Sequence, residues 1–312
     1  MHPAVSIIFF TTASGAGYGL LVLLGWGVLV GHLGTQVGFG ICAFGLALGL
    51  VGAGLLSSLG HLGHPERAWR ALTQWRSSWL SREGVSAILT FLPALFLAWS
   101  WVVVGSVSSA AAALTILGAI VTTICTAMIY ASLKPIRAWR NPWTVPIYLV
   151  LGLYTGALLT ALLLHVYGMR GPFIGFMIAI TGLAGAALKI GYWLFLDRGV
   201  AASTPESATG LGAIGKVRML DPPHTESNYL LKEMGYRVAR KHAKRLRLIV
   251  LALGFGMPIL LTVLAHGVGP AMAIVLSLAA AVLGGLGVVV ERWLFFAEAR
   301  HTVTLYYGAS HA

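Results

Sequence analysis

The sequence has few charged residues. Only 10% of its 312 residues are Asp, Glu, Lys or Arg, and the first 60 residues contain none of these four types. Soluble domains have about a quarter of their residues charged. Hydrophobic residues make up 58% of the chain. This composition excludes an ordinary soluble enzyme and predicts a polytopic membrane protein.

Cysteine and the common catalytic motifs are also scarce. The two cysteines, Cys42 and Cys125, lie inside apolar runs without a CxxC spacing, which argues against disulfides and metal ligation. The chain has no CxxCH for covalent haem and no Walker A, HExxH or GxSxG motif. We therefore assign no catalytic residue and no metal ligand. We expect the chain by itself not to catalyse conversion of a substrate.

Apolar runs long enough to cross a bilayer, about 20 residues each, occur eight times. They predict an all-α integral membrane protein, a bundle of eight transmembrane helices forming one domain over residues 1–312. The start of the chain lacks the positive charge of a signal peptide, so the first run is expected to be retained as a helix. The predicted spans are 4–31, 37–60, 84–105, 109–131, 144–166, 172–196, 247–267 and 270–295.

An even number of spans places both termini on one side, together with segments 61–83, 132–143 and 197–246. The two shorter segments carry seven Lys and Arg, whereas the opposite connections carry only Arg170. The positive-inside rule makes the first side cytoplasmic. The chain is thus expected in a bacterial cytoplasmic membrane, with 197–246 as a basic cytoplasmic segment between spans six and seven.

The net charge of +12 raises the possibility of a nucleic-acid partner. However, the cations lie in short segments between apolar runs, which favours anionic lipids and another protein as partners. The basic stretch at 237–247 could extend span seven as a helix, but an anchor at anionic headgroups is the favoured interpretation.

Three ionisable residues fall at or inside the predicted spans, where charge is costly and commonly functional. Glu83, Lys189 and Glu291 all lie toward the cytoplasmic side, which predicts a shared polar pocket. Separate structural roles remain open: Glu83 could pair with nearby arginines, Lys189 could snorkel to the surface, and Glu291 could pair with Arg292.

Histidines at the same membrane depth extend this set toward quinone chemistry. Reduction of a quinone needs hydrogen-bond donors to its oxygens and a proton route to water, and an imidazole can supply both. The nearby tryptophans Trp69, Trp75 and Trp79 are typical of an interfacial belt, although one could flank a quinone ring. The candidate quinone-binding residues are His61, His64, Arg82, Glu83, Lys189 and Glu291.

Haem ligation by His32, His165 and His266 is a less favoured alternative. These residues lie at span ends on the opposite side, where single histidines are usually interfacial. A bis-histidine haem would need two that face each other at depth. We expect no metal, although haem b remains open.

Glycine clusters in the first two spans predict close helix packing, since small residues let transmembrane helices approach one another. The pattern is strongest at Gly15, Gly17, Gly19, Gly45, Gly49, Gly52 and Gly54.

Several longer motifs resemble the membrane anchor subunits of dimethyl sulfoxide reductase-type molybdoenzymes (DmsC family) along nearly the whole chain. They are MHPAVSIIFFTTASGAGYG, HLGHPERAWRAL with SSWLSREG, MIYASLKPIRAWRNPW and ERWLFFAEARHTVTLYYG. The resemblance implies a quinone site close to a docked ferredoxin-like iron–sulfur subunit, with a molybdopterin catalytic subunit beyond it. It ties the positions of His61 and Glu83 to quinol binding. The long basic segment 197–246 departs from the better-known anchors.

This resemblance, joined to the charge asymmetry, predicts the partner and the direction of electron flow. Partners docked on the cytoplasmic side favour a sulfite dehydrogenase complex that reduces ubiquinone or menaquinone. Alternatives are the anchor of an exported sulfoxide reductase that oxidises quinol, a polysulfide reductase-type anchor, and a secondary transporter. The residues expected to dock the iron–sulfur subunit are Arg67, Arg70, Arg76, Lys134, Arg137 and Arg140.

Overall fold

A computed structural model describes residues 4–33, 35–60, 64–169, 171, 173–198, 203–221 and 238–310. The fold is all-α, and eight helices in these ranges are long and apolar enough to cross a membrane. The spans are α1 (Val5–Leu29), α2 (Val37–Leu59), α3 (Trp79–Trp99) continued by η2 (Ser100–Val104), α4 (Ser109–Ala131), α5 (Thr144–Val166), α6 (Ile174–Arg198), the continuous run α9 (Val238–Ile249), η4 (Val250–Gly256) and α10 (Met257–Ala265), and α11 (Pro270–Ala297). Short helices η1 (Pro65–Gln74), α7 (Pro205–Thr209), η3 (Leu211–Ala213) and η5 (Thr302–Tyr307) lie in the connections and near the C-terminus.

The start of span three differs from the sequence prediction. The helix begins at Trp79, not at 84, because the side chain of Ser78 accepts a hydrogen bond from Ser81 N at 3.4 Å and caps the first turn. Glu83 is therefore held inside the helix, one turn beyond its start. Arg82 likewise belongs to the helix and not to the preceding loop.

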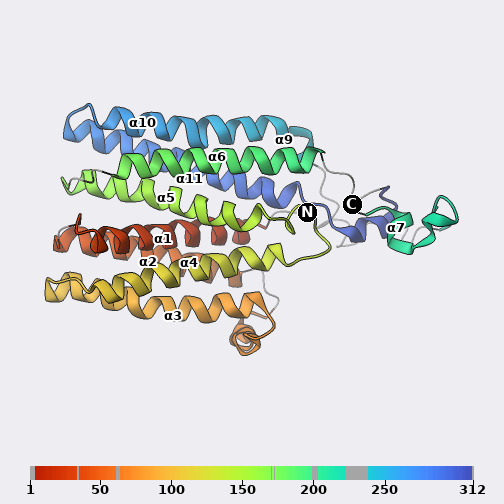
Figure 1. Cartoon of the computed structure of the whole chain (residues 1–312), viewed down its shortest axis with the longest axis horizontal. Helices are drawn as coiled ribbons and strands as arrows, with labels where there is room; N and C mark the ends of the chain where they lie inside the picture. The colour runs from red at the N-terminus through yellow and green to blue at the C-terminus, as the bar shows by residue number, and fades with distance from the viewer. Residues whose placement is uncertain are drawn as a thin grey trace.

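The helices form two groups along the bundle (Figure 1). One contains α1 to α4, and the other contains α5, α6, α10 and α11. Helices α1 and α5 join the two groups at their closest approach: a Cβ at Gly19 would lie 1.8 Å from the carbonyl oxygen of Gly152, so the backbones touch there. Small residues at this crossing are thus a steric requirement.

The prediction of close packing at the glycines of span two was only partly right. Gly54 packs against α1, with Ser14 N 2.9 Å from where a Cβ would stand. Gly45, Gly49 and Gly52 instead face open space within 4 Å, because α2 presents that side away from its neighbours. A leucine at Gly49 or Gly52 therefore meets no steric barrier within this chain.

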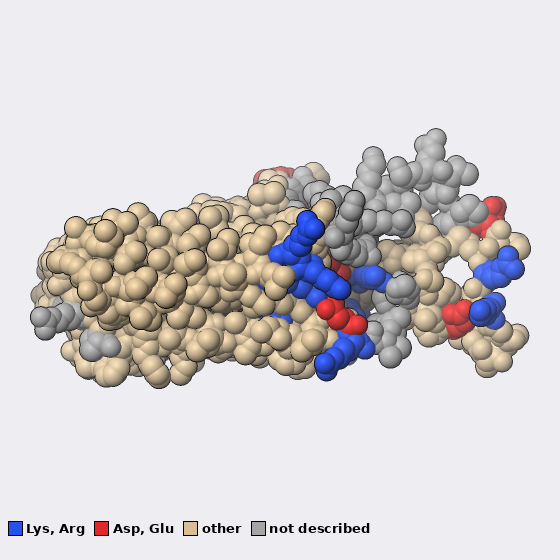
Figure 2. All heavy atoms as spheres, turned by 90° about the horizontal axis from the view of Figure 1, so that it is seen from above, with Lys and Arg blue, Asp and Glu red and all other residues tan. Residues whose placement is uncertain are grey.

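Both ends of the described chain lie at the same end of the bundle (Figure 1). We call this end, with the described parts of the connections, 64–78, 132–143 and 203–221, the basic face. In Figure 2 the visible Lys and Arg gather toward it, while the other end shows no visible charge. The helix from Val238 runs without interruption into span seven, so the described part of the basic stretch extends that span as a helix. Its anchoring at anionic headgroups stays a prediction.

Span seven is irregular because it contains Pro258. Proline has no amide hydrogen, so the carbonyl of Gly254, four residues earlier, cannot accept the usual α-helical hydrogen bond. The backbone widens into the π-helical segment η4, and the hydroxyl of Tyr154 donates to Gly254 O at 2.7 Å. This bond ties α5 to span seven.

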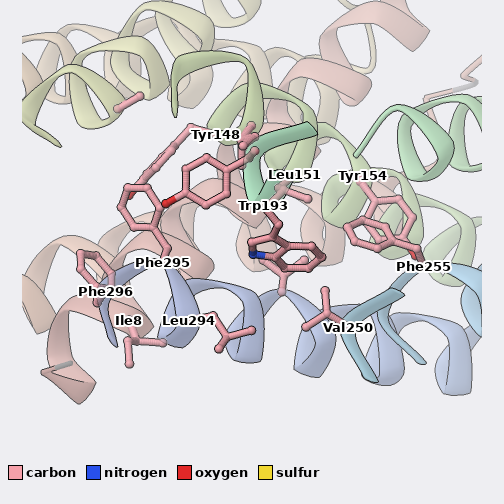
Figure 3. Packing of buried hydrophobic residues seen from close by; sticks show 14 of the residues in the cluster. Ile8, Tyr148, Leu151, Tyr154, Trp193, Val250, Phe255, Leu294, Phe295 and Phe296 are labelled. Carbon is pink, nitrogen blue, oxygen red and sulfur yellow. The ribbon is translucent and has the colours of Figure 1, made fainter. Parts of the chain in front are cut away.

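Aromatic side chains fill the second helix group (Figure 3). Tyr148 and Phe295 pack edge to face, with ring centroids 5.8 Å apart. Tyr154 and Phe255 pack farther along the bundle, and Trp193 lies between the two groups of rings in the view. The rings of Tyr148, Phe295 and Trp193 lie against buried cations described below.

Candidate functional site

Glu83 is a buried carboxyl group near the basic face, with 3% of its surface exposed. The hydroxyl of Thr126 on α4 donates a hydrogen bond to its Oε1. Neighbouring Arg82 turns away, since its Nε and Nη2 donate to the carbonyls of Trp75 and Arg76 at 2.9 and 2.8 Å. Pairing of Glu83 with a nearby arginine is therefore wrong. Within the described ranges no Lys or Arg forms an ion pair with Glu83.

The predicted histidines do not complete this site in the described part of the chain. His61 lies outside the described residues. His64 is exposed, and its Nδ1 lies 3.0 Å from Glu66 Oε1, so its ring pairs locally with that carboxylate. Arg82 is half-buried, with its guanidinium 4.2 Å from the centroid of the Trp79 ring. Neither side chain contacts Glu83.

Lys189, Glu291 and Arg292 form a second buried cluster, which we call the charged trio. Lys189 Nζ lies 2.5 Å from Glu291 Oε1, and Arg292 Nε donates to Glu291 Oε2 at 2.6 Å. Lys189 and Glu291 are fully buried and Arg292 is 2% exposed. The snorkelling interpretation of Lys189 is wrong, whereas the Glu291–Arg292 pair does form.

Aromatic rings enclose the cations of the charged trio. Lys189 Nζ lies 4.1 Å from the centroid of the Tyr192 ring and 4.9 Å from that of Trp193. The Arg292 guanidinium carbon lies 4.1 Å from the centroid of Tyr148. Cation–π contact of this kind partly replaces water around a buried cation.

Glu83 and the charged trio do not share one set of contacts, so a single pocket built from Glu83, Lys189 and Glu291 was only partly right. A small cavity of about 20 Å³ is lined by one residue that belongs to the trio and by one that bonds to Glu83, although Glu83, Lys189 and Glu291 themselves do not line it. Thr126 comes from the Glu83 side and Arg292 from the trio. The other lining residues are Thr11, Thr12, Ser14, Gly15, Ala16, Tyr18, Thr123, Tyr148, Leu151, Gly152, Thr155 and Val288.

A third group of charges lies where the bundle meets the basic face. Arg247 Nη1 donates to Asp197 at 2.7 Å and its Nη2 donates to Glu298 at 2.8 Å. The Asp197 side chain is 53% exposed and that of Glu298 is 8% exposed. Burial raises the pKa of the Glu298 carboxyl, and the adjacent Arg247 opposes this shift. We call these three residues the surface triad.

The expected docking residues all lie on the basic face. Arg137 is half-buried, with its guanidinium 4.7 Å from the centroid of the Phe195 ring and hydrogen-bonded to Phe195 O, so it also ties the connection to α6. The other five are exposed: Arg67, Arg70, Arg76, Lys134 and Arg140.

The histidines of the opposite side have local partners. His165 Nδ1 lies 2.6 Å from Ser277 Oγ, and His266 Nδ1 lies 2.7 Å from the carbonyl of Thr262. The ring of His32 packs against Phe173, with centroids 5.2 Å apart. Among the described residues, no group of three or more His, Cys, Asp or Glu is arranged to hold a metal ion.

Sequence reasoning missed several residues of the buried site. Arg292 was considered only as a partner for Glu291, and Thr126, Tyr148, Arg247 and Glu298 were not singled out. Helical spacing offered one signal, because Thr122 and Thr126 stand one turn apart on a single face of α4. Such a polar row in an apolar helix indicates a polar neighbour.

The comparisons with known proteins agree over nearly the whole length of the sequence. The family model of the DMSO reductase anchor subunit (DmsC) matches residues 1–308. The protein is 34% identical to a sulfite dehydrogenase subunit from Allochromatium vinosum, over 98% of its own length and 99% of that protein. It is 27% identical to one of the chains of anaerobic dimethyl sulfoxide reductase from Escherichia coli, over 57% of its own length and 63% of that one. The chain is therefore a multi-pass membrane protein of the DMSO reductase anchor subunit family.

Proposed function

We propose that this anchor subunit binds a membrane quinone beside Glu83 and passes electrons between that quinone and an iron–sulfur subunit docked on the basic face. The observation that carries the proposal is the buried Glu83 carboxyl, which has a hydroxyl partner and, among the described residues, no cation. A carboxyl in such surroundings can take up and release a proton without breaking an ion pair.

The chemistry requires proton exchange at the place where electrons arrive. A quinone that gains two electrons forms quinol by binding two protons, one at each oxygen. Glu83 lies one helical turn inside the basic face, close to the 60–78 connection. In the proposed site His61 donates to one quinone oxygen and Glu83 exchanges protons.

A matched pair of carboxyl variants tests this role. In the purified complex, Glu83→Gln should slow electron transfer to a quinone analogue by about 100-fold, the usual scale for a lost acid–base group, while the complex stays assembled. Glu66→Gln removes an exposed carboxyl from the neighbouring connection and should leave the rate unchanged. Equal rates in the native protein and Glu83→Gln would place proton exchange elsewhere.

The proposed direction is oxidation of sulfite with reduction of ubiquinone or menaquinone. Similarity to the sulfite dehydrogenase subunit over nearly the full length of both proteins supports it. The orientation follows from the basic face, which the positive-inside rule assigns to the cytoplasm. Cysteines introduced at exposed positions 134 and 140 should be protected from an impermeant thiol reagent in intact bacteria. Labelling there would support an exported reductase that oxidises quinol.

We propose that the exposed cations of the basic face bind an iron–sulfur subunit of acidic or mixed charge. That subunit connects the anchor to a molybdopterin subunit. Charge reversal at Arg67, Arg70 and Arg140 together should release the partner from membranes, because all three guanidinium groups are exposed. Reversal of Arg137 alone is a poor test, since that residue also holds α6. Co-purification of the triple variant at native yield would refute the assignment.

The family match favours this anchor role over a secondary transporter or a polysulfide reductase-type anchor. The described spans also place their buried charges toward the basic face, whereas coupled transport typically uses sites near the bilayer midplane.

A further inference from the structure

Among the described residues, the buried charges form three groups in succession, and each group reaches the next through shared neighbours. Starting at the basic face, they are the surface triad, the charged trio and the Glu83 site. Only the first includes a half-exposed side chain, that of Asp197. This order resembles a path that starts at water beside Asp197 and runs across the bundle to Glu83.

The surface triad and the charged trio meet at Trp193. Lys189 Nζ lies 4.9 Å from the centroid of the indole ring, and the Arg247 guanidinium carbon lies 5.4 Å from the centroid of the same ring. Three buried polar atoms at this junction have no hydrogen-bond partner among the described protein atoms: Trp193 Nε1, Arg247 Nε and Glu298 Oε2. Buried polar groups in proteins are nearly always satisfied, and water is the usual partner when no protein atom serves.

The charged trio and the Glu83 site meet at the cavity. Arg292 is 2% exposed and lines the cavity, and its Nη1 and Nη2 have no acceptor among the described residues. The hydroxyls of Thr123 and Thr155 donate to carbonyls of their own helices at 2.8 and 2.9 Å, which leaves their oxygens able to accept. A cavity of about 20 Å³ with such donors and acceptors has room for about one water molecule.

Thr126 connects this cavity to Glu83. Its hydroxyl lines the cavity and donates to Glu83 Oε1. A hydroxyl can accept a proton from water on one side while it gives its own proton to a carboxylate on the other. Thr126 is therefore placed to pass a proton between a cavity water and Glu83.

The charge balance of the trio shows which residue can release a proton. With all three side chains ionised, two cations share one carboxylate. The guanidinium of Arg292 stays protonated in proteins, so the proton that can leave belongs to Lys189. Its departure leaves the neutral pair Glu291–Arg292, which needs no further compensation.

We propose that these groups form a water-bridged proton relay between the basic face and Glu83, running from Asp197 and Glu298 through Lys189 to water in the Arg292 cavity and to Thr126, with the Glu291 carboxylate as a fixed counter-charge. The relay rests on the proposed quinone function. Each proton that reaches Glu83 moves on to a reduced quinone oxygen and forms its O–H bond. Glu83 is left as a carboxylate, which the relay then protonates again. The electrons come from the docked iron–sulfur subunit, and oxidation of quinol sends the protons the other way.

The test uses the purified complex with a soluble quinone analogue, and it measures both the affinity for the analogue and turnover in H₂O and D₂O. Thr126→Val removes the hydroxyl with little change of shape, and it should lower turnover by about tenfold or more, with analogue affinity unchanged. Thr126→Ser keeps a hydroxyl and should restore turnover. Lys189→Met should also lower turnover and should increase the solvent isotope effect.

Tyr154→Phe supplies the control. Tyr154 is a buried tyrosine of α5 that bonds to Gly254 and is not among the cavity-lining residues, so its loss should reduce thermal stability and leave turnover per assembled complex unchanged. Native turnover and isotope effect in both Thr126→Val and Lys189→Met, with the analogue bound normally, would overturn the relay and leave the quinone site standing. Failure of the native complex to bind any quinone analogue would overturn the proposed function, and the relay with it.

Discussion

Glu83 and Glu291 are both buried carboxyl groups on the basic-face side of the bundle, but their charged surroundings differ. Glu291 contacts two cations, at 2.5 and 2.6 Å. Glu83 contacts a hydroxyl and, among the described residues, no cation.

This difference in neighbouring cations determines which of the two carboxyl groups can change its charge. Desolvation makes an isolated buried carboxylate costly, whereas two adjacent cations offset that cost. Protonation of Glu291 would leave Lys189 and Arg292 unbalanced, so this carboxylate is a fixed charge. Among the described residues Glu83 has no such constraint, and there its protonation disturbs only the hydrogen bond to Thr126. The proposed relay requires a fixed carboxylate at Glu291, beside a lysine that can release its proton, and a carboxyl at Glu83 that can gain one.

The largest expected effect comes from neutralising the fixed charge. Glu291→Gln leaves two cations buried without a counter-charge, and removal of one partner from a buried ion pair costs about 3–5 kcal/mol. We expect a large loss of assembled protein and a clear fall in the midpoint of thermal unfolding in detergent. If Glu291→Gln and Glu83→Gln lose the same stability, the contrast between the two carboxyls is wrong.

A smaller effect is expected when Lys189 is removed. Lys189→Met leaves the neutral Glu291–Arg292 pair in place, and the new side chain is apolar and of similar length. The expected cost is about 1–3 kcal/mol, mainly from the lost interaction with Glu291. Thermal unfolding of Lys189→Met and Glu291→Gln under the same conditions compares how much stability each residue of the trio contributes. A cost equal to that of Glu291→Gln would show that the trio acts as one indivisible unit.

The sequence predicted the spans well because each apolar run has the length that a bilayer demands. It could not say which way neighbouring side chains point. Consecutive residues on a helix differ in direction by about 100°. Arg82 turns outward to the connection before α3, while Arg292 turns inward together with Glu291. Packing of α11 against the rings of α5 decides the second case, and no single-helix pattern contains that information.

The glycines show the same limit of the sequence, which does not tell what a given residue faces. The sequence marks Gly19 and Gly49 equally, yet one touches the backbone of α5 and the other faces open space. The spacing of small residues predicts that a helix has a smooth face. Only the arrangement of the other helices determines whether another helix covers it.

Glu83→Gln should have a small effect on stability despite its burial. Glutamine keeps an oxygen that can accept from Thr126, and no cation of the described ranges loses its partner. We expect a change of about 1 kcal/mol or less in the free energy of unfolding. Thermal unfolding of the same preparation used for turnover separates a functional loss from a structural one. A fall as large as that in Glu291→Gln would mean that Glu83 carries a structural charge.

The smallest expected effect concerns the surface triad, which sharpens the contrast between exposed and buried charge. Asp197 is half-exposed, and Arg247 keeps its bond to Glu298 when Asp197 is replaced. Asp197→Asn should therefore change stability by about 0–1 kcal/mol, as is usual for exposed ion pairs.

That change should disappear at high salt, because exposed pairs are screened, while the cost of Glu291→Gln should persist, because buried pairs are screened much less. Unfolding measured at low and high salt compares both variants in one experiment. A salt-sensitive Glu291→Gln would mean that water and ions reach the trio, and the fixed-charge assignment would then fail.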